Sequence, residues 1–327
     1  MKICVVGAGS IGGLIAAYLG RAGHDVSVVA RGAHLAAIRE KGLTLIKGAE
    51  RFTLRCAASD DPGKLGAQDH VFIALKAHGI AAMLPRLGPL LAKNTAVVPA
   101  INGIPWWYFH KEGGKFDGGT VDCLDPDGAM LRALDPARVL GCVVYPAATV
   151  AAPGAVEQTT ADAAFALGEP DGRSSARAGT LAAAMTAAGM KTSVTPKIRD
   201  AIWNKLLGNV SFNPIAALAL ARMGEIFARP KLVEIAAVIM RETMAVGAAY
   251  GVSFPVDVPQ RVEVARGLGN NKPSMLQDVE RGRKMEVEAI VGAVVELARR
   301  AGVATPTVDW IYALLAARDA ALGAAKG

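Results

Sequence analysis

The chain has 327 residues, which suggests two domains, and 52% of them are hydrophobic, enough to bury a large core. Its net charge of +7 is not gathered into Lys- or Arg-rich runs, and aromatics are not interleaved with basic residues, so we expect no nucleic-acid partner. No uninterrupted apolar stretch reaches the about 18 residues of a membrane span, so we expect no membrane partner. The four cysteines are scattered without a C-x-x-C pair, which indicates a cytoplasmic protein with reduced thiols and no metal site.

The first predicted element is a short buried strand at residues 3–6, followed at once by a glycine-rich turn. This turn, Gly7-Ala8-Gly9-Ser10-Ile11-Gly12, has the pattern G-x-G-x-x-G and precedes a predicted helix at 14–19 and a strand at 25–30. In that context the pattern indicates a dinucleotide site rather than a plain glycine-rich turn. The first glycine allows the tight turn, the second leaves room for the pyrophosphate, and the third lets the helix pack against the strand. The helix N-terminus offers its N–H groups to the phosphates.

The second strand ends in Val29-Ala30-Arg31-Gly32, without the acidic side chain that holds the ribose hydroxyls in NAD enzymes. A guanidinium can form paired hydrogen bonds with a phosphate and keeps its charge. We therefore predict NADP(H) rather than NAD(H), with Arg31 at the 2′-phosphate. The alternative is a solvated surface arginine.

The chain between residues 34 and 101 predicts further α/β structure. We expect a helix at 34–41, a hairpin over 43–57, a buried strand at 70–76, a proline-broken helix at 79–91 and a strand at 95–101. Ligands of open α/β sheets bind at the carboxyl ends of strands, where Lys76 and Asn102 fall. Asn102-Gly103 can also be a simple turn, because both residues tolerate a left-handed backbone.

Residues 104–136 are expected to be irregular and contain Trp106-Trp107-Tyr108-Phe109. These aromatics could be a buried plug or the lid or wall of a substrate pocket. Short, mainly antiparallel strands at 139–150, 156–159 and 163–168 and a helix at 173–188 should close the first domain, with a linker at 192–196. We predict a Rossmann-like dinucleotide-binding domain at residues 1–191.

Residues 192–327 carry apolar residues at helical spacing and are predicted to form an all-α substrate domain, with the binding site between the two domains. In a helix at 200–212, Lys205, Asn209 and Asn213 would lie within about 80° of one face over about 12 Å. Pro214 should kink or break this helix. The polar side chains could form a substrate-facing wall, or the asparagines could satisfy freed backbone groups at the kink.

A last long helix is expected from residue 273 to residue 299. Ser274 with Gln277 has the form of a capping box, so Ser274 could be an N-cap or could bind a carboxylate. The acidic residues in this helix are Asp278, Glu280, Glu286 and Glu288. Their spacing along the sequence does not indicate which of these acidic residues belongs to a functional site.

Together these motifs resemble the ketopantoate reductase (2-dehydropantoate 2-reductase) family over nearly the whole chain. The resemblance rests on Gly7 to Gly12, Arg31, Leu75-Lys76, Asn102-Gly103, Lys205-x-x-x-Asn209-x-x-x-Asn213-Pro214, and Ser274 to Asp278 with Glu286 twelve residues after the serine. It implies an NADP-dependent oxidoreductase that acts on a small 2-oxo acid. The first candidate reaction is reduction of 2-dehydropantoate to pantoate in pantothenate biosynthesis.

The resemblance also implies roles for single residues. Gly7, Ala8, Gly9, Ser10, Ile11, Gly12, Arg31, Lys76, Asn102, Ala147 and Glu286 would contact the cofactor. Asn102, Lys205, Asn209, Asn213 and Ser274 would contact the substrate. Lys205 would be the proton donor, and Glu286 would lie beside it. Some members place a further substrate-binding Asn where this chain has Met223.

Three other functions remain open at this point. The chain could reduce a different 2-oxo acid, could be a β-hydroxyacid or opine-type dehydrogenase, or could sense NADP(H) without catalysis. The alanine-rich helical half could also supply the face of a homodimer.

Overall fold

The computed structural model describes residues 1–267 and 269–324, which form two compact units. The first unit comprises residues 1–101, 109–118 and 128–198. The second comprises 102–108, 119–127 and the described residues from 199 onward. Two pieces that follow the parallel sheet in sequence therefore belong to the helical unit.

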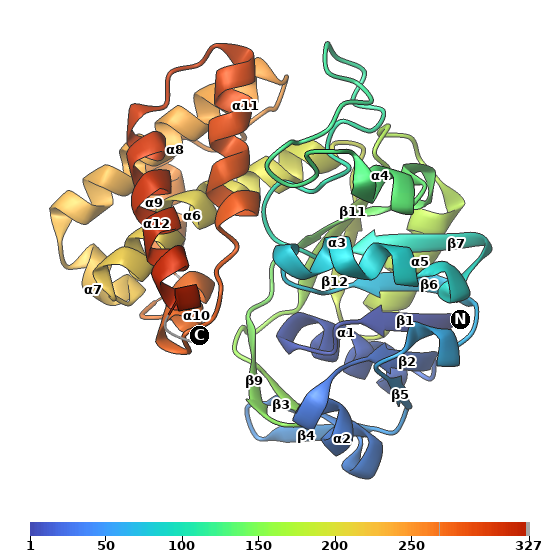
Figure 1. Cartoon of the computed structure of the whole chain (residues 1–327). Helices are drawn as coiled ribbons and strands as arrows, with labels where there is room; N and C mark the ends of the chain where they lie inside the picture. Colours follow the sequence, from blue (N-terminus) through green and yellow to red (C-terminus); the bar gives the residue numbers. More distant parts are fainter. Residues whose placement is uncertain (268, 325–327) are drawn as a thin grey trace. The chain divides into compact units, whose positions relative to one another are not determined.

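A five-stranded parallel sheet forms the centre of the first unit (Figure 1). Its order is β5 (Ala57–Ser59), β2 (Asp25–Val29), β1 (Lys2–Val6), β6 (Gln68–Ile73) and β7 (Leu91–Pro99), with every neighbouring pair parallel. The carboxyl halves of β1, β2, β6 and β7 are buried, as in a sheet that is covered on both faces. The predicted Rossmann-like α/β domain is confirmed.

Helix α1 (Ser10–Arg21) packs between this sheet and a four-stranded sheet of order β4-β3-β10-β9. The second sheet contains β3 (Leu43–Lys47), β4 (Glu50–Leu54), β9 (Ala148–Ala152) and β10 (Ala155–Gln158). A Cβ at Gly13 would lie 2.7 Å from Val156, and one at Gly20 would lie 2.4 Å from Leu54. These glycines let the second sheet approach the helix, and the antiparallel β3–β4 pair confirms the predicted hairpin.

The third sheet has the order β12-β11-β8, from β12 (Lys191–Val194), β11 (Ala164–Gly168) and β8 (Gly141–Val144). β8 is antiparallel to β11, whereas β12 is parallel to it. The prediction of a linker at 192–196 was wrong, because helix α5 (Ala176–Ala187) is a crossover that returns the chain to the edge of β11. The strands from residue 139 to residue 168 are split between two sheets.

The remaining elements of the first unit are short. They are α2 (Gly32–Lys41), η1 (Pro62–Lys64), η2 (Ala77–Gly79), α3 (Ile80–Met83), η3 (Leu84–Arg86), η4 (Gly88–Leu90), α4 (Ala129–Ala133) and η5 (Pro136–Arg138). The helix predicted at 79–91 is reduced to one α-helical turn and two 3₁₀ turns, since Pro85 and Pro89 each start a new turn.

The second unit is helical, as predicted. It contains α6 (Ile198–Ala219), α7 (Met223–Phe227), α8 (Pro230–Ala249), α9 (Val258–Arg266), α10 (Ser274–Glu280), the π-helical η6 (Glu288–Gly292), α11 (Ala293–Ala301) and α12 (Pro306–Ala324). Helix α8 packs against α7, α9, α11 and α12. Its Glu242 carboxylate accepts hydrogen bonds from the N–H groups of Thr307 and Val308, at the positive end of the α12 dipole.

Helix α6 continues through Pro214 to Ala219, so of the expected kink or break, the break was wrong. A proline inside a helix costs about 3 kcal/mol. The surrounding turn is buried, with Val210 fully covered and Ile215 3% exposed. Because full burial of one such side chain contributes about 1.5–3 kcal/mol, packing of this segment offsets the cost of the proline.

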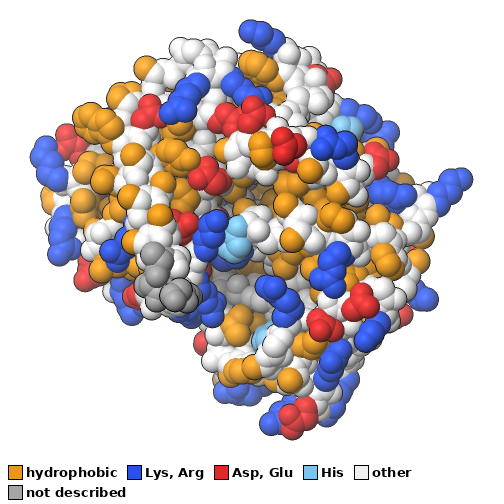
Figure 2. Space-filling model, in the orientation of Figure 1, with side chains coloured by type: hydrophobic (Ala, Val, Ile, Leu, Met, Phe, Trp, Pro, Cys, Tyr) orange, Lys and Arg blue, Asp and Glu red, His pale blue; other side chains and the backbone are white. Residues whose placement is uncertain are grey.

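Charged side chains are dispersed over the surface. Figure 2 shows Lys and Arg interspersed with Asp and Glu on one face of each unit, without a single basic patch. Within residues 1–267 and 269–324, no helix combines the length and the apolar character that crossing a membrane would need.

Candidate active site

The glycine turn links the three central strands of the parallel sheet. The N–H groups of Gly7 and Ala8 both bond to the carbonyl of Val29, at the end of β2. Gly7 has φ +98°, and a Cβ there would lie 2.7 Å from the carbonyl of Ala74, just beyond β6. A Cβ at Gly12 would lie 1.9 Å from the Gly7 carbonyl. The predicted tight turn and close helix packing are confirmed.

The N-terminus of α1 presents hydrogen-bond donors that the helix itself does not use. Its N-cap is Gly9, which has no side chain to cap the helix, and Gly13 N–H is the first to bond within it, to Gly9 O at 2.7 Å. The preceding N–H groups, from Gly9 to Gly12, therefore lie outside the helical ladder. A Cβ at Gly9 would have no heavy atom within 4 Å. This combination of donors, dipole and open space fits the pyrophosphate of a dinucleotide.

Arg31 and Lys76 follow the two strands that flank β1. Arg31 is the exposed N-cap of α2, two residues beyond β2, and Lys76 is the N-cap of η2, three residues beyond β6. Ala147 precedes β9, where its N–H donates to Thr160 and its carbonyl accepts from Thr159. The first two positions lie at the carboxyl edge of the sheet, where such folds bind ligands.

In the second unit, Asn102 lies between Lys205 and Glu286. Lys205 Nζ donates to Asn102 Oδ1 at 2.6 Å, and Asn102 Nδ2 donates to Glu286 Oε2 at 3.4 Å. Glu286 is 4% exposed, so its carboxylate is largely removed from water. The ammonium and the carboxylate fix the orientation of the amide, because only its oxygen can accept and only its nitrogen can donate.

The backbone after Asn102 is anchored to the π-helical turn η6. Ile104 N–H donates to Ala289 O at 2.8 Å. Between them Gly103 has φ +79°, and a Cβ there would lie 2.1 Å from Ala289 O. Asn102-Gly103 is thus a turn, and the Asn102 amide also contacts Lys205 and Glu286. π-Helical turns are often found at functional sites.

Gly103→Ala is expected to destabilise the enzyme and to weaken the Asn102 contacts. An alanine at positive φ costs about 1 kcal/mol, and the clash with Ala289 adds about 1–3 kcal/mol. Thermal unfolding measures the first effect, and NMR of the Asn102 side-chain amide measures the second. Gly113→Ala is the matched control, since Gly113 has the same φ of +79° and no heavy atom within 4 Å of a Cβ. Equal losses in the two variants would show that the Ala289 contact contributes nothing.

Farther along α6, Asn213 Nδ2 donates to Ser274 Oγ at 3.4 Å. Asn209 lies on the same helix, between Lys205 and Asn213. Ser274 is the first residue of α10, whose N-cap is Pro273, and no side chain caps this helix. Gln277 instead donates to Lys272 O. The predicted capping box was therefore wrong, and the Ser274 hydroxyl faces the asparagine of α6.

The expected long helix over 273–299 is interrupted at residues 281–286, where Gly282 has φ +56°. The break places the four acidic residues, which their spacing did not distinguish, in three different segments of the chain. Glu286, in the non-helical segment, reaches Asn102, whereas Glu288 accepts from the Tyr312 hydroxyl at 3.0 Å and Glu280 pairs with Lys272. Asp278 is 5% exposed.

The aromatic run after Gly103 is buried rather than exposed as a lid. Trp106, Trp107, Tyr108 and Phe109 are at most 1% exposed. In the second unit, Trp203 Nε1 donates to the Tyr108 hydroxyl at 2.8 Å, and Arg199 donates to the Tyr108 carbonyl at 2.9 Å. This burial favours the plug over the lid, and it holds the segment that begins at Asn102 against α6.

Burial raises the pKa of Cys4 and of Cys56 to about 11, so both remain protonated at neutral pH. Within the described residues, the cysteines form no disulfide, and no group of three His, Cys, Asp or Glu side chains could hold a metal ion.

The parallel sheet, the glycine turn and the lysine-amide-carboxylate contact define a dinucleotide-binding oxidoreductase. The family models agree with this class: Ketopantoate reductase PanE/ApbA matches residues 3–112, and Ketopantoate reductase PanE/ApbA C terminal matches residues 197–319. The chain belongs to the ketopantoate reductase family.

Individual relatives cover nearly the whole chain. The 2-dehydropantoate 2-reductase of Mesorhizobium japonicum is 46% identical over 96% of this chain and 97% of its own length. A solved structure from Ralstonia solanacearum MolK2 has a TM-score of 0.93 at 35% identity and covers 98% of each chain. The 2-dehydropantoate 2-reductase of Methylococcus capsulatus has a TM-score of 0.82 at 30% identity, again over 98% of each chain.

Proposed function

We propose that this oxidoreductase uses NADPH to reduce a 2-oxo acid, with 2-dehydropantoate (ketopantoate) as the first candidate substrate. The observation that carries the proposal is the 2.6 Å contact between Lys205 Nζ and Asn102 Oδ1, with Glu286 on the other side of the amide. This contact supports Lys205 as the proton donor, because its ammonium is held in position by a neighbouring amide. A non-catalytic NADP(H) sensor would not need this arrangement.

In the proposed mechanism, bound NADPH supplies a hydride to the keto carbon of the substrate. Negative charge develops on the keto oxygen, which Lys205 stabilises and then protonates to give the 2-hydroxy acid. Asn102 holds the ammonium in place through its carbonyl oxygen. Glu286 holds Asn102 and supplies the negative charge that balances the lysine.

The polar groups farther along α6 suit the remainder of the substrate. We assign the substrate carboxylate to Ser274 and the hydroxyl of ketopantoate to Asn209 and Asn213. Met223, buried at the start of α7, stands where the resemblance places a further amide in other members. Because Met223 is apolar where other members would have an amide, 2-oxo acids with an apolar distal group should be tested beside ketopantoate.

We assign the 2′-phosphate of the cofactor to Arg31 and the NADPH side of the site also to Lys76, Ala147 and the backbone of the glycine turn. The reaction with ketopantoate gives pantoate, a step of pantothenate biosynthesis. The cytoplasmic location and the homodimer remain predictions.

The test is a steady-state assay of NADPH and NADH oxidation with ketopantoate and several 2-oxo acids that have bulkier or purely apolar side chains. We expect the highest kcat/KM with NADPH and a 2-oxo acid. A preference for an apolar acid over ketopantoate would assign a different substrate to the same chemistry. If no oxo or hydroxy acid is turned over although NADPH binds, the reductase proposal fails.

A further inference from the structure

His34 joins three segments of the first unit, and sequence analysis had placed it only in a helix. It lies on the first turn of α2, three residues after Arg31, and is half-buried. Its Nε2 lies 2.7 Å from the carbonyl oxygen of Ala8, in the glycine turn. Its Nδ1 accepts a hydrogen bond of 3.0 Å from the N–H of Gly154, in the turn between β9 and β10. Both ring nitrogens therefore contact backbone groups.

These two contacts determine the tautomer of the ring. A backbone N–H can only donate, so Nδ1 must be the unprotonated nitrogen of the imidazole. The neutral ring then carries its hydrogen on Nε2, which donates to Ala8.

The bond to Ala8 also controls the direction of the next N–H group. The carbonyl of Ala8 and the N–H of Gly9 belong to one peptide, and in a trans peptide they point in opposite directions. No cis peptide occurs in the described residues. Gly9 has no side chain to limit rotation of this peptide. By holding the carbonyl, His34 aims the N–H of Gly9, the uncapped N-cap of α1, away from itself.

We propose that His34 is a positioning residue for the cofactor, which sets the Gly9 N–H for the pyrophosphate by fixing the Ala8 carbonyl. This inference rests on the proposed function only in that the glycine turn binds a dinucleotide. Because NADPH and NADH share the pyrophosphate, His34 affects both cofactors equally. Arg31, which is assigned to the 2′-phosphate, affects NADPH alone.

The experiment compares the dissociation constants of NADPH and NADH by fluorescence titration in four folded variants. His34→Ala is expected to raise both constants about tenfold, the effect of losing one hydrogen bond of about 1.4 kcal/mol. His34→Gln should recover part of the affinity, since an amide can both accept and donate. Arg31→Ala should raise the constant for NADPH only. Arg39→Ala is the matched control, because Arg39 also bonds from α2 to a backbone carbonyl, that of Ala58, but away from the turn.

Kinetics separate positioning from general damage to the fold. At saturating NADPH, His34→Ala should keep a kcat close to that of the wild type while the KM for NADPH rises. Unchanged dissociation constants in folded His34→Ala would overturn the proposal, and so would an effect confined to NADPH. If the wild type binds neither cofactor, the dinucleotide assignment itself fails.

A measurement on the wild-type protein needs no folded variant. The ¹⁵N shifts of the His34 ring should show the tautomer with hydrogen on Nε2. A hydrogen on Nδ1 would contradict the geometry on which the inference depends.

Discussion

Lys205→Ala is expected to lower kcat for the 2-oxo acid about 10²–10⁴-fold, the usual contribution of a positioned general acid. The variant loses the ammonium that lies 2.6 Å from Asn102, which the proposed mechanism uses to protonate the keto oxygen. The NADPH dissociation constant should remain near the wild-type value, because the glycine turn and Arg31 are unchanged. Steady-state kinetics and fluorescence titration measure the two quantities.

Lys231→Ala is the control for this variant, since Lys231 is an exposed lysine of α8 that pairs with Glu234. It should leave kcat unchanged. Added primary amines should restore part of the activity of Lys205→Ala, because they can occupy the volume of the missing side chain and donate a proton. A kcat near the wild-type value in Lys205→Ala would remove this residue from the mechanism.

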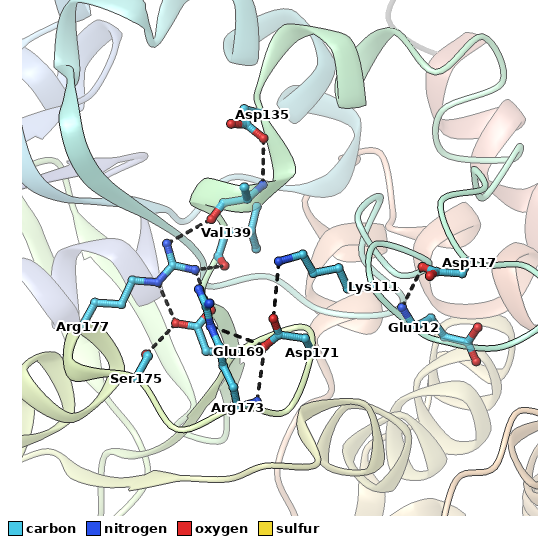
Figure 3. Close-up of polar contacts among 11 residues, drawn as sticks. Lys111, Glu112, Asp117, Asp135, Val139, Glu169, Asp171, Arg173, Ser175 and Arg177 are labelled. Atoms are coloured by element: carbon cyan, nitrogen blue, oxygen red, sulfur yellow. Dashed lines mark hydrogen bonds and ion pairs between the residues drawn. The ribbon is translucent and has the colours of Figure 1, made fainter.

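Arg177→Met is expected to lower the free energy of unfolding by about 3–5 kcal/mol at neutral pH, the cost of leaving a buried charge without its partner. Figure 3 shows the guanidinium of Arg177 beside the carboxylate of Glu169, at the end of β11. Arg177 Nε donates to Glu169 Oε1 at 2.7 Å, and the Glu169 side chain is only 2% exposed. Ser175, the N-cap of α5, donates to the same carboxylate oxygen at 2.6 Å.

Arg177 also donates to the carbonyls of Ala137 and Val139, at 3.1 and 2.9 Å. One side chain therefore connects the end of β11, the start of α5 and the segment that leads into β8. Removing it takes this donor from two carbonyls and leaves the Glu169 carboxylate without its ion-pair partner. The measurement is chemical denaturation, and Lys111→Met is its control. Lys111 pairs with Asp171 at 3.4 Å in the same region but is about half exposed, so its loss should cost about 0–1 kcal/mol.

The stability difference between wild type and Arg177→Met should depend on pH. Burial raises the pKa of Glu169, but hydrogen bonds from Arg177 and Ser175 outweigh burial and hold this pKa below the ordinary value. A carboxyl with a lowered pKa in the folded state contributes stability above its unfolded pKa of about 4.3. That contribution disappears as the pH falls through the folded pKa. The difference should thus be largest near neutral pH and should shrink below about pH 4. A constant difference would show that the carboxylate charge is not responsible.

Much of the first unit could be predicted because its signals are local. The apolar strand, the glycine pattern and the helix follow one another without a gap, and the structure confirms the steric reasons for Gly7 and Gly12. The helical half was also predicted from apolar spacing. Its details were not, since the length of α6 depends on burial around Pro214 and the break at 281–286 depends on Gly282.

The sequence predicts which residues belong to the candidate site, but it does not predict how their side chains are arranged in space. Lys205, Asn213 and their spacing on one helix are visible in the sequence. Their partners Asn102 and Ser274 come from distant positions, and only the folded chain shows that Asn102 lies between Lys205 and Glu286. His34 gave no local signal at all, because its significance depends on contacts with Ala8 and Gly154.

Asn102 belongs to the helical unit although it follows the last strand of the parallel sheet. Exchanging residues 1–198 between two relatives, as in a chimera meant to change cofactor preference, would therefore import a foreign Asn102 and the segment up to Tyr108. The recipient would then carry a new first unit and, with it, foreign pieces of the helical unit that contains Lys205. A clean exchange must leave both residues 102–108 and residues 119–127 with the recipient, so that each parent keeps its own amide beside its own lysine.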